Sequence, residues 1–120
     1  NYLILKDSDS NYIVQKREGK GIWENLYEFP LLETDFLLSE KDAIDQISKM
    51  QFYNQKPSDI LILQNEITLH KLSHQHLHIR FFELRFTSKL PDSKPFTEIE
   101  KLPFPIVIHN FIVANYCNSL

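Results

Sequence analysis

Residues 77–86 read LHIRFFELRF and form the longest strand that the sequence predicts. Apolar side chains recur at every second position, as expected for a strand with a buried face. The alternation changes phase part-way along, so that successive apolar sets face opposite sides: Leu77, Ile79 and Phe81, then Phe82, Leu84 and Phe86. Either a bulge near Phe81 or burial on both faces accounts for this change.

Shorter β-rich segments precede this strand. Residues 2–5 and 12–16 are separated by the polar stretch DSDSN at 7–11, which predicts a turn and hence a hairpin. Residues 59–63 and 67–71 are two further predicted strands.

Two helices complete the predicted elements. Ser39 supplies the hydroxyl of an N-cap, and apolar residues then recur at helical spacing: Ala43, Ile44, Ile47 and Met50. A second helix is predicted beyond Pro105, although residues 106–108 also fit the start of a strand; its apolar face would hold Ile108, Phe111, Ile112 and Tyr116. Strands in two groups, with one helix between them and one after them, predict an α+β domain.

The bulk composition is that of one small folded domain. The chain has 120 residues, of which 42% are hydrophobic and 12% aromatic, so it can bury a core. Its single cysteine, Cys117, excludes an intrachain disulfide, which favours a reducing cytoplasm. No apolar run approaches the roughly 20 residues of a membrane span, and a monomer is expected. The start at Asn1, directly before an apolar strand, suggests a domain cut from a longer polypeptide.

Charge is unevenly distributed along the chain. The net charge of −3 argues against simple nonspecific DNA binding, which needs cations to neutralise phosphates. Between residues 70 and 89, however, four cations and four histidines accompany one acid, whereas residues 33–45 hold five acids and one lysine. Either one face contacts phosphate or the charges are ordinary surface scatter.

Neither the acidic helix nor the tryptophan gives a clear site. Asp42 and Asp45 share a helix face, which leaves open a weak metal contact or, more simply, a solvated acidic face. Trp23 lies in an apolar segment typical of a core, the alternative being an exposed ring that stacks on a base. No metal site is predicted.

The histidine-rich stretch is equally ambiguous. Four histidines lie at alternate or nearby positions and could ligate a metal: His70, His74, His76 and His78. No cysteine or suitably spaced acid accompanies them, however. Packing, loop capping or DNA contact is therefore the simpler role. Ser73 next to His74 suggests a nucleophile and base, yet no third residue orients them. No catalytic residue is predicted.

Two segments resemble the C-terminal domain of A/G-specific adenine DNA glycosylases, the MutY family. They are residues 20–30, KGIWENLYEFP, and residues 71–77, KLSHQHL. The resemblance covers nearly the whole chain, as far as LPFP at 102–105. It implies one domain over residues 1–120 with a Nudix-like mixed β-sheet flanked by two helices, the fragment of a longer glycosylase.

The helix that corresponds to the Nudix signature is degraded. Nudix hydrolysis needs carboxylates that hold a divalent metal against a pyrophosphate, supplied by an Arg-Glu pair and a Glu-Glu pair. Residues 39–49 read SEKDAIDQISK and contain neither pair, and no glycine follows Gly21. The fragment is therefore not expected to be an enzyme.

The resemblance implies instead that the domain reads 8-oxoguanine opposite adenine in double-stranded DNA. In the family, a Phe-Ser-His loop contacts the oxidised base; Ser73 and His74 match this loop, and Leu72 replaces the aromatic residue. The other candidate DNA contacts are His76, Lys71, Arg80 and Lys89. The parent, by resemblance, is an adenine DNA glycosylase of the bacterial cytoplasm, used at the nucleoid.

The implied parent carries its chemistry and a [4Fe–4S] cluster in an N-terminal catalytic domain, which would be the partner of this fragment. One cysteine cannot supply the four thiolates of such a cluster, so no cofactor is expected here. Two alternatives remain: a Nudix hydrolase acting on nucleoside diphosphate-linked substrates, and a degenerate Nudix module that binds another protein.

Overall fold

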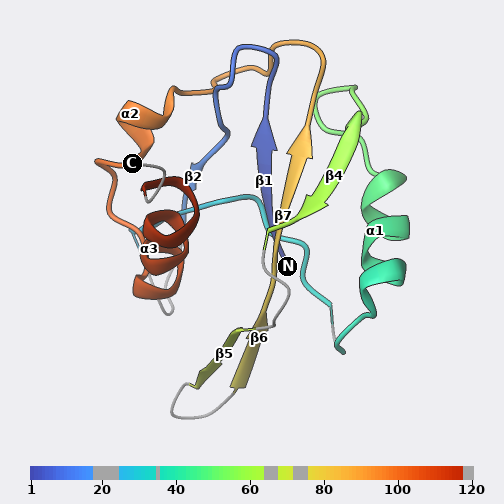
Figure 1. Cartoon of the computed structure of the whole chain (residues 1–120), viewed down its shortest axis with the longest axis vertical. Coiled ribbons are helices and arrows are strands. Elements are labelled where there is room, and N and C mark those ends of the chain that lie inside the picture. The colour runs from blue at the N-terminus through green and yellow to red at the C-terminus, as the bar shows by residue number, and fades with distance from the viewer. Residues whose placement is uncertain (18–24, 35, 64–67, 72–75, 118–120) are drawn as a thin grey trace.

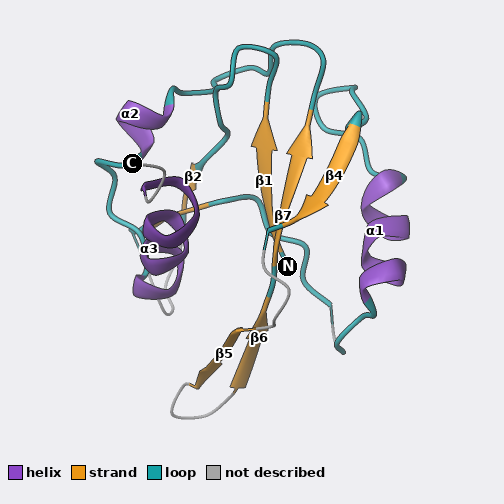
Figure 2. Cartoon of the chain, in the orientation of Figure 1, coloured by secondary structure: helices purple, strands orange, loops and turns teal. Residues whose placement is uncertain are grey.

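The computed structural model describes residues 1–17, 25–34, 36–63, 68–71 and 76–117, with the backbone alone for 68–71, 76, 77 and 117. A three-stranded mixed sheet in the order β1–β7–β4 forms its centre (Figures 1 and 2). β1 (Tyr2–Lys6) runs parallel to β7 (Phe81–Arg85), and β4 (Asp59–Ile62) runs antiparallel to β7 on its other side.

Two small antiparallel pairs accompany the central sheet. β2 (Gln15–Lys16) pairs with β3 (Tyr27–Glu28), and β5 (Thr68–Lys71) pairs with β6 (His76–Ile79). Figure 1 shows the β5–β6 pair beyond the end of the sheet at which β7 begins, away from the helices. The expected α+β class, a mixed sheet flanked by helices, is confirmed.

Helices cover both faces of the central sheet. α1 (Glu40–Ser48) and α3 (Ile106–Ile112) lie on opposite sides of it (Figure 1). Alternate residues of β1 therefore enter different cores: Tyr2 and Ile4 pack in the cluster that includes Phe111, whereas Leu3 and Leu5 pack in the cluster that includes Ile47.

The sequence-predicted helix at Ser39 is confirmed. The Ser39 Oγ accepts a hydrogen bond from the Asp42 backbone N–H at 3.1 Å, which satisfies a donor that the first helical turn leaves free. Ala43 and Ile47 are fully buried against the sheet. This helix is specified locally, by one cap and one apolar stripe.

The C-terminal helix is also confirmed, and the alternative strand at 106–108 is wrong. α3 begins directly after Pro105 and continues as a π-helical turn, η1 (Val113–Cys117). The short helix α2 (Phe96–Ile99) was not predicted, because a four-residue helix that follows Pro95 has no room for a periodic pattern.

The phase change in residues 77–86 results from burial on both faces. Phe81 packs towards α3, whereas Phe82 and Leu84 pack towards α1. Position 83, on the α3 side, holds a buried glutamate instead of an apolar residue. The run is also interrupted at Arg80, so the single predicted strand is two strands, β6 and β7.

The predicted hairpin of residues 2–5 and 12–16 is only a turn with one bridge. Lys6 and Tyr12 form an isolated antiparallel bridge, and β2 then leaves to pair with β3. Asp7 closes the turn by accepting hydrogen bonds from the backbone N–H groups of Asp9 and Asn11, each at 3.0 Å. β1 takes β7 as its neighbour in place of the nearby segment.

Within the described part of the chain, no helix has the length and hydropathy needed to cross a membrane.

Candidate nucleic-acid interface

The β5–β6 hairpin is the element that carries most of the sequence-predicted contact residues. Its register pairs Thr68 with Ile79 at one end and Lys71 with His76 at the other. Residues 72–75 connect the two strands beyond this last pair, so Leu72, Ser73 and His74 lie outside the described residues. The backbone positions of Lys71 and His76 mark the two ends of that connection.

Burial at the base of the hairpin distinguishes its two faces. Ile79 is 5% exposed and belongs to the core on the α3 side, whereas the neighbouring His78 is exposed. Since residues paired across an antiparallel ladder share a face, positions 69, 71, 76 and 78 belong to one face and positions 68, 70, 77 and 79 to the other. Lys71 and His76 thus occupy positions on the face where His78 is exposed.

Arg80 does not fit the role predicted for it. The residue is only 4% exposed, and its Nε donates a hydrogen bond to Oδ1 of Asn1 at 3.1 Å. A phosphate contact requires a guanidinium that reaches solvent, and this one is enclosed at the junction of β6 and β7. This burial could not be predicted, because an arginine next to a histidine-rich segment has the sequence pattern of an exposed cation.

Lys89 and the β5–β6 hairpin lie beyond opposite ends of β7. It follows the C-terminal end of β7, whereas the hairpin precedes the N-terminal end. Its Nζ lies 3.4 Å from Oδ2 of Asp9, and both side chains are largely exposed. The structure does not bring Lys89 together with Lys71 and His76.

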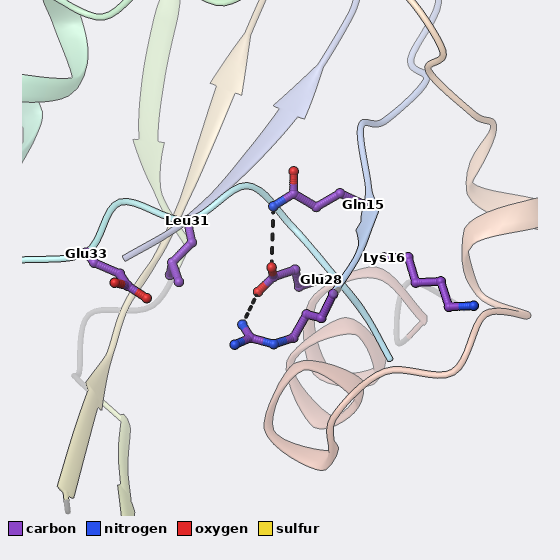
Figure 3. Close-up of a pocket in the computed structure, with 6 residues that line it drawn as sticks. Gln15, Lys16, Glu28, Leu31 and Glu33 are labelled. Atoms are coloured by element: carbon purple, nitrogen blue, oxygen red, sulfur yellow. Dashed lines mark hydrogen bonds and ion pairs between the residues drawn. The ribbon is translucent and has the colours of Figure 1, made fainter. Parts of the chain in front are cut away.

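An open pocket of about 380 Å³ lies beside the β2–β3 pair, and its residues were not predicted as a site (Figure 3). Arg17 Nη1 contacts Glu28 Oε1 at 2.7 Å, and Gln15 Nε2 donates to Glu28 Oε2 at 3.3 Å. Glu28, within the YEFP motif at 27–30, is 7% exposed. Both carboxylate oxygens of Glu28 thus already accept a hydrogen bond, one from Arg17 and one from Gln15. In the sequence, the only signal for this position was that Glu28 belongs to the motif in residues 20–30.

The acidic residues of α1 point to solvent. Asp42 and Asp45 are exposed, and Asp45 Oδ2 lies 3.2 Å from Lys49 Nζ. Among the described residues, no three histidine, cysteine or acidic side chains lie close enough together to hold a metal ion. Trp23 and both glycines fall outside the described residues.

A family model described as NUDIX domain matches residues 1–114. The chain belongs to the NUDIX domain family. None of the curated proteins matches it.

α1 is the helix that the sequence predicts to correspond to the carboxylate-bearing helix of hydrolytic NUDIX domains. Hydrolytic members need several acidic side chains that converge on a metal-bound pyrophosphate. On α1, Glu40, Asp42 and Asp45 are exposed, and one of the three is already paired with a lysine. This donor set fits a solvated helix face better than a metal centre.

Proposed function

We propose that this NUDIX domain recognises 8-oxoguanine in DNA on behalf of an adenine DNA glycosylase, with the β5–β6 hairpin as the reading element. The observation that supports the proposal is the placement of the motif. The Leu72-Ser73-His74 sequence connects the two strands of a hairpin that stands apart from the central sheet and the helices (Figure 1). Such a position gives a loop access to a duplex without steric conflict with the domain core.

The chemistry of the oxidised base explains why a serine would be used. Guanine presents N7 as an acceptor in the major groove, whereas oxidation at C8 turns N7 into a donor and adds a carbonyl oxygen. The Ser73 hydroxyl can accept from N7–H, and a neighbouring backbone N–H can donate to the new oxygen. Because a hydroxyl rotates and serves either base, the fixed N–H supplies most of the discrimination, about 1–3 kcal/mol for a good pair of contacts.

The remaining contacts follow from the hairpin. Lys71 and His76 flank the connection and would contact the phosphates next to the oxidised base, and Leu72 would press against a base step in place of the family's aromatic residue. His74 would contact the base or a phosphate. Lys89, beyond the other end of β7, would at most make a remote phosphate contact.

The proposal includes the partners of the domain. The duplex would carry 8-oxoguanine opposite adenine, and a catalytic domain elsewhere in the parent polypeptide would flip out and excise the adenine. That missing domain would hold the [4Fe–4S] cluster. The domain would act as a monomer and have no glycosylase activity of its own.

NMR titration of the ¹⁵N-labelled domain with two duplexes tests this function. One duplex carries 8-oxoguanine opposite adenine and the other carries guanine. We expect shifts of the amides of residues 71–76 that are larger and saturate earlier with the oxidised duplex. Equal shifts with both duplexes would reduce the domain to a general DNA clamp, and no shifts at low salt would refute DNA recognition by this domain.

A serine variant refines the test. Ser73→Ala should weaken binding of both duplexes about three- to tenfold, as expected for loss of one neutral hydrogen bond, and should lower the preference for the oxidised duplex by a smaller factor, because the backbone N–H remains. Ser48→Ala on α1 is the matched control, since the Ser48 hydroxyl donates only to the Asp45 carbonyl on an exposed surface.

The hydrolase alternative makes a different prediction. It predicts that the domain releases pyrophosphate from nucleotides in the presence of magnesium, and that Asp42→Ala or Asp45→Ala abolishes this activity.

A further inference from the structure

On its β6 side, the β5–β6 hairpin joins the central sheet through one residue. β6 ends at Ile79 and β7 begins at Phe81, so Arg80 alone lies between them. β6 pairs only with β5, whereas β7 pairs with β1 and β4. The other connection, between β4 and β5, lies largely outside the described residues, so Arg80 is the described link whose conformation and contacts bear on the direction of the hairpin.

Both the backbone and the side chain of Arg80 are held by the first two residues of the chain. The Arg80 carbonyl accepts a hydrogen bond from the Tyr2 N–H at 2.8 Å, and the Arg80 Nε donates to Asn1 Oδ1 at 3.1 Å. The Asn1 Nδ2 in turn donates to the Leu32 carbonyl at 3.2 Å. A continuous set of hydrogen bonds thus connects the base of the hairpin, the start of β1 and the segment that follows β3.

The Arg80 guanidinium is buried without a full set of hydrogen-bond acceptors, so its charge does not stabilise the fold. It lies over the Phe82 ring, with 5.7 Å between Cζ and the ring centroid, and the residue is 4% exposed. Its Nη2 is buried and has no hydrogen-bond acceptor among the described residues. Since a buried charged donor without an acceptor destabilises a fold, an apolar side chain of similar length would be tolerated at least as well.

We propose that Arg80 is a positioning residue that fixes the direction of the β5–β6 hairpin, and that this direction determines how well the domain distinguishes 8-oxoguanine from guanine. The second half of the inference rests on the proposed function, and the first half does not. Arg80 acts through the hairpin without touching DNA. Its Nε–H holds Asn1, a donor that methionine lacks and that lysine does not carry at that point of its side chain, whereas the backbone bond to Tyr2 remains in either variant.

Two variants of Arg80 separate positioning from folding. Arg80→Met removes the charge and the buried unpaired donor, and Arg80→Lys keeps the charge but loses the Nε donor that bonds Asn1. We expect the melting temperature of Arg80→Met to be unchanged or raised, and the preference of both variants for the oxidised duplex to fall at least fivefold. Arg85→Lys, the same change at the other end of β7, should leave the preference unchanged. If Arg80→Met does not fold, Arg80→Lys carries the comparison.

Salt dependence distinguishes positioning from a direct phosphate contact. A residue that neutralises one phosphate contributes about 0.9 to the slope of log affinity against log salt concentration. Arg80→Met should leave this slope as it is in the wild type, whereas a slope reduced by about 0.9 would show a phosphate contact and overturn the inference. Lys101→Met, which removes an exposed charge outside the hairpin, controls for the change in net charge.

Residual dipolar couplings test the structural half without DNA. In the wild type, the amides of β5, β6, β1 and β7 should fit one common alignment. In Arg80→Met and Arg80→Lys, the hairpin amides should require an alignment different from that of the sheet. An unchanged common fit in both variants would refute the positioning role even if the domain discriminates the two duplexes. A wild type that fits the common alignment yet shows no preference would instead refute the proposed function alone.

Discussion

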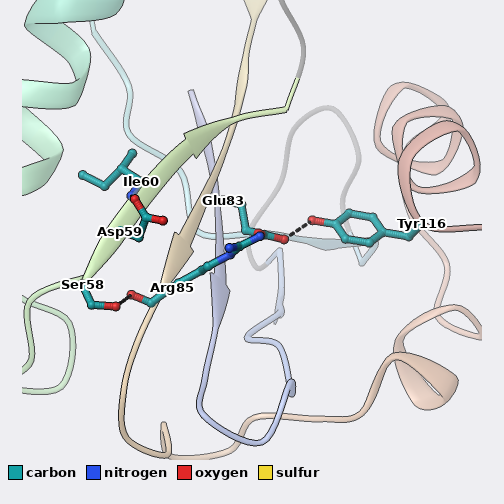
Figure 4. A network of polar contacts seen from close by, with 6 residues as sticks. All are labelled: Ser58, Asp59, Ile60, Glu83, Arg85 and Tyr116. Carbon is teal, nitrogen blue, oxygen red and sulfur yellow. Dashed lines mark hydrogen bonds and ion pairs between the residues drawn. The ribbon is translucent and has the colours of Figure 1, made fainter.

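The Tyr116 hydroxyl donates a hydrogen bond of 3.0 Å to Oε1 of Glu83, which connects the π-helical turn η1 to the buried centre of β7 (Figure 4). The other oxygen of Glu83 accepts from Arg85 Nε at 2.9 Å. Glu83 is 4% exposed, so these two partners replace the water that its carboxylate loses on folding. The C-terminal segment is thereby fixed to the middle strand of the sheet.

Tyr116→Phe should lower the free energy of unfolding by about 1–3 kcal/mol, because it leaves one buried carboxylate oxygen without a donor. Urea denaturation at neutral pH measures this loss. Tyr53→Phe is the control, since Tyr53 is 52% exposed and its hydroxyl makes no hydrogen bond within the described residues. Equal stabilities of the two variants would show that the Tyr116–Glu83 contact does not stabilise the fold.

Stability should decrease in alkaline solution. Burial, reinforced by the charge of Glu28, raises the pKa of Tyr2 to about 12 from 10.0. Burial also raises the pKa of Tyr12. Between pH 10 and 12 the unfolded chain releases the Tyr2 proton while the folded chain retains it, so the free energy of unfolding falls as pH rises through this window, and Tyr12 contributes in the same direction.

Tyr2→Phe isolates the contribution of one group to that decrease. The variant should match the wild type near neutral pH and should lose stability less steeply above pH 10. Urea denaturation at several pH values between 9 and 12 gives the two slopes. Identical slopes would mean that Tyr2 ionises equally easily in the folded and unfolded chains.

Asp7 should protect the fold against acid. Burial alone raises the pKa of this carboxyl, but hydrogen bonds from Ser93, Leu90, Asn11 and Asp9 together hold it below 3.8. Its stabilising effect is therefore present above that value and is lost as pH falls through the folded-state pKa. The carboxylate joins the β1–β2 turn to residues 90–93, beyond the end of β7.

Asp7→Asn should lower the free energy of unfolding at pH 7 by about 1.5–3 kcal/mol, because an amide cannot accept on both sides. It should also flatten the decline in stability below pH 4. Asp9→Asn is the matched control: its contact with Lys89 is exposed, and such pairs contribute at most about 1 kcal/mol. A flat acid response already in the wild type would contradict the role given to Asp7.

The stacked pair Phe81–Phe111 should dominate the packing of α3 on the sheet. Their ring centroids are 3.7 Å apart and their planes are nearly parallel, at 6°. Phe111→Ala should cost about 3–5 kcal/mol through lost contacts and a cavity, and Phe111→Leu distinctly less. Phe36→Ala, at a site that is 71% exposed, should change stability by less than about 0.5 kcal/mol. Thermal and urea unfolding compare the three variants.

Local signals in the sequence were sufficient for several elements. The Ser39 cap and the apolar stripe through Ala43 and Ile47 gave α1, and the spacing of Ile108 and Phe111 gave the C-terminal helix. These patterns concern neighbours within one or two turns, so they are present in the chain before any tertiary contact forms. The family match over residues 1–114 confirms the expected Nudix-like domain, which the motif in residues 20–30 had helped to suggest.

Only the tertiary structure decided how residues 77–86 are used. The parallel pairing of β1 with β7 joins Tyr2 to Phe81, and no local pattern specifies a partner so distant along the chain. The same packing buries Arg80 and Glu83, two charged residues that nothing in the sequence distinguishes from charged residues on the surface. Charge and periodicity are properties of the chain, whereas burial depends on which distant segments cover a residue, and that is why the burial of Arg80 emerged only from the fold.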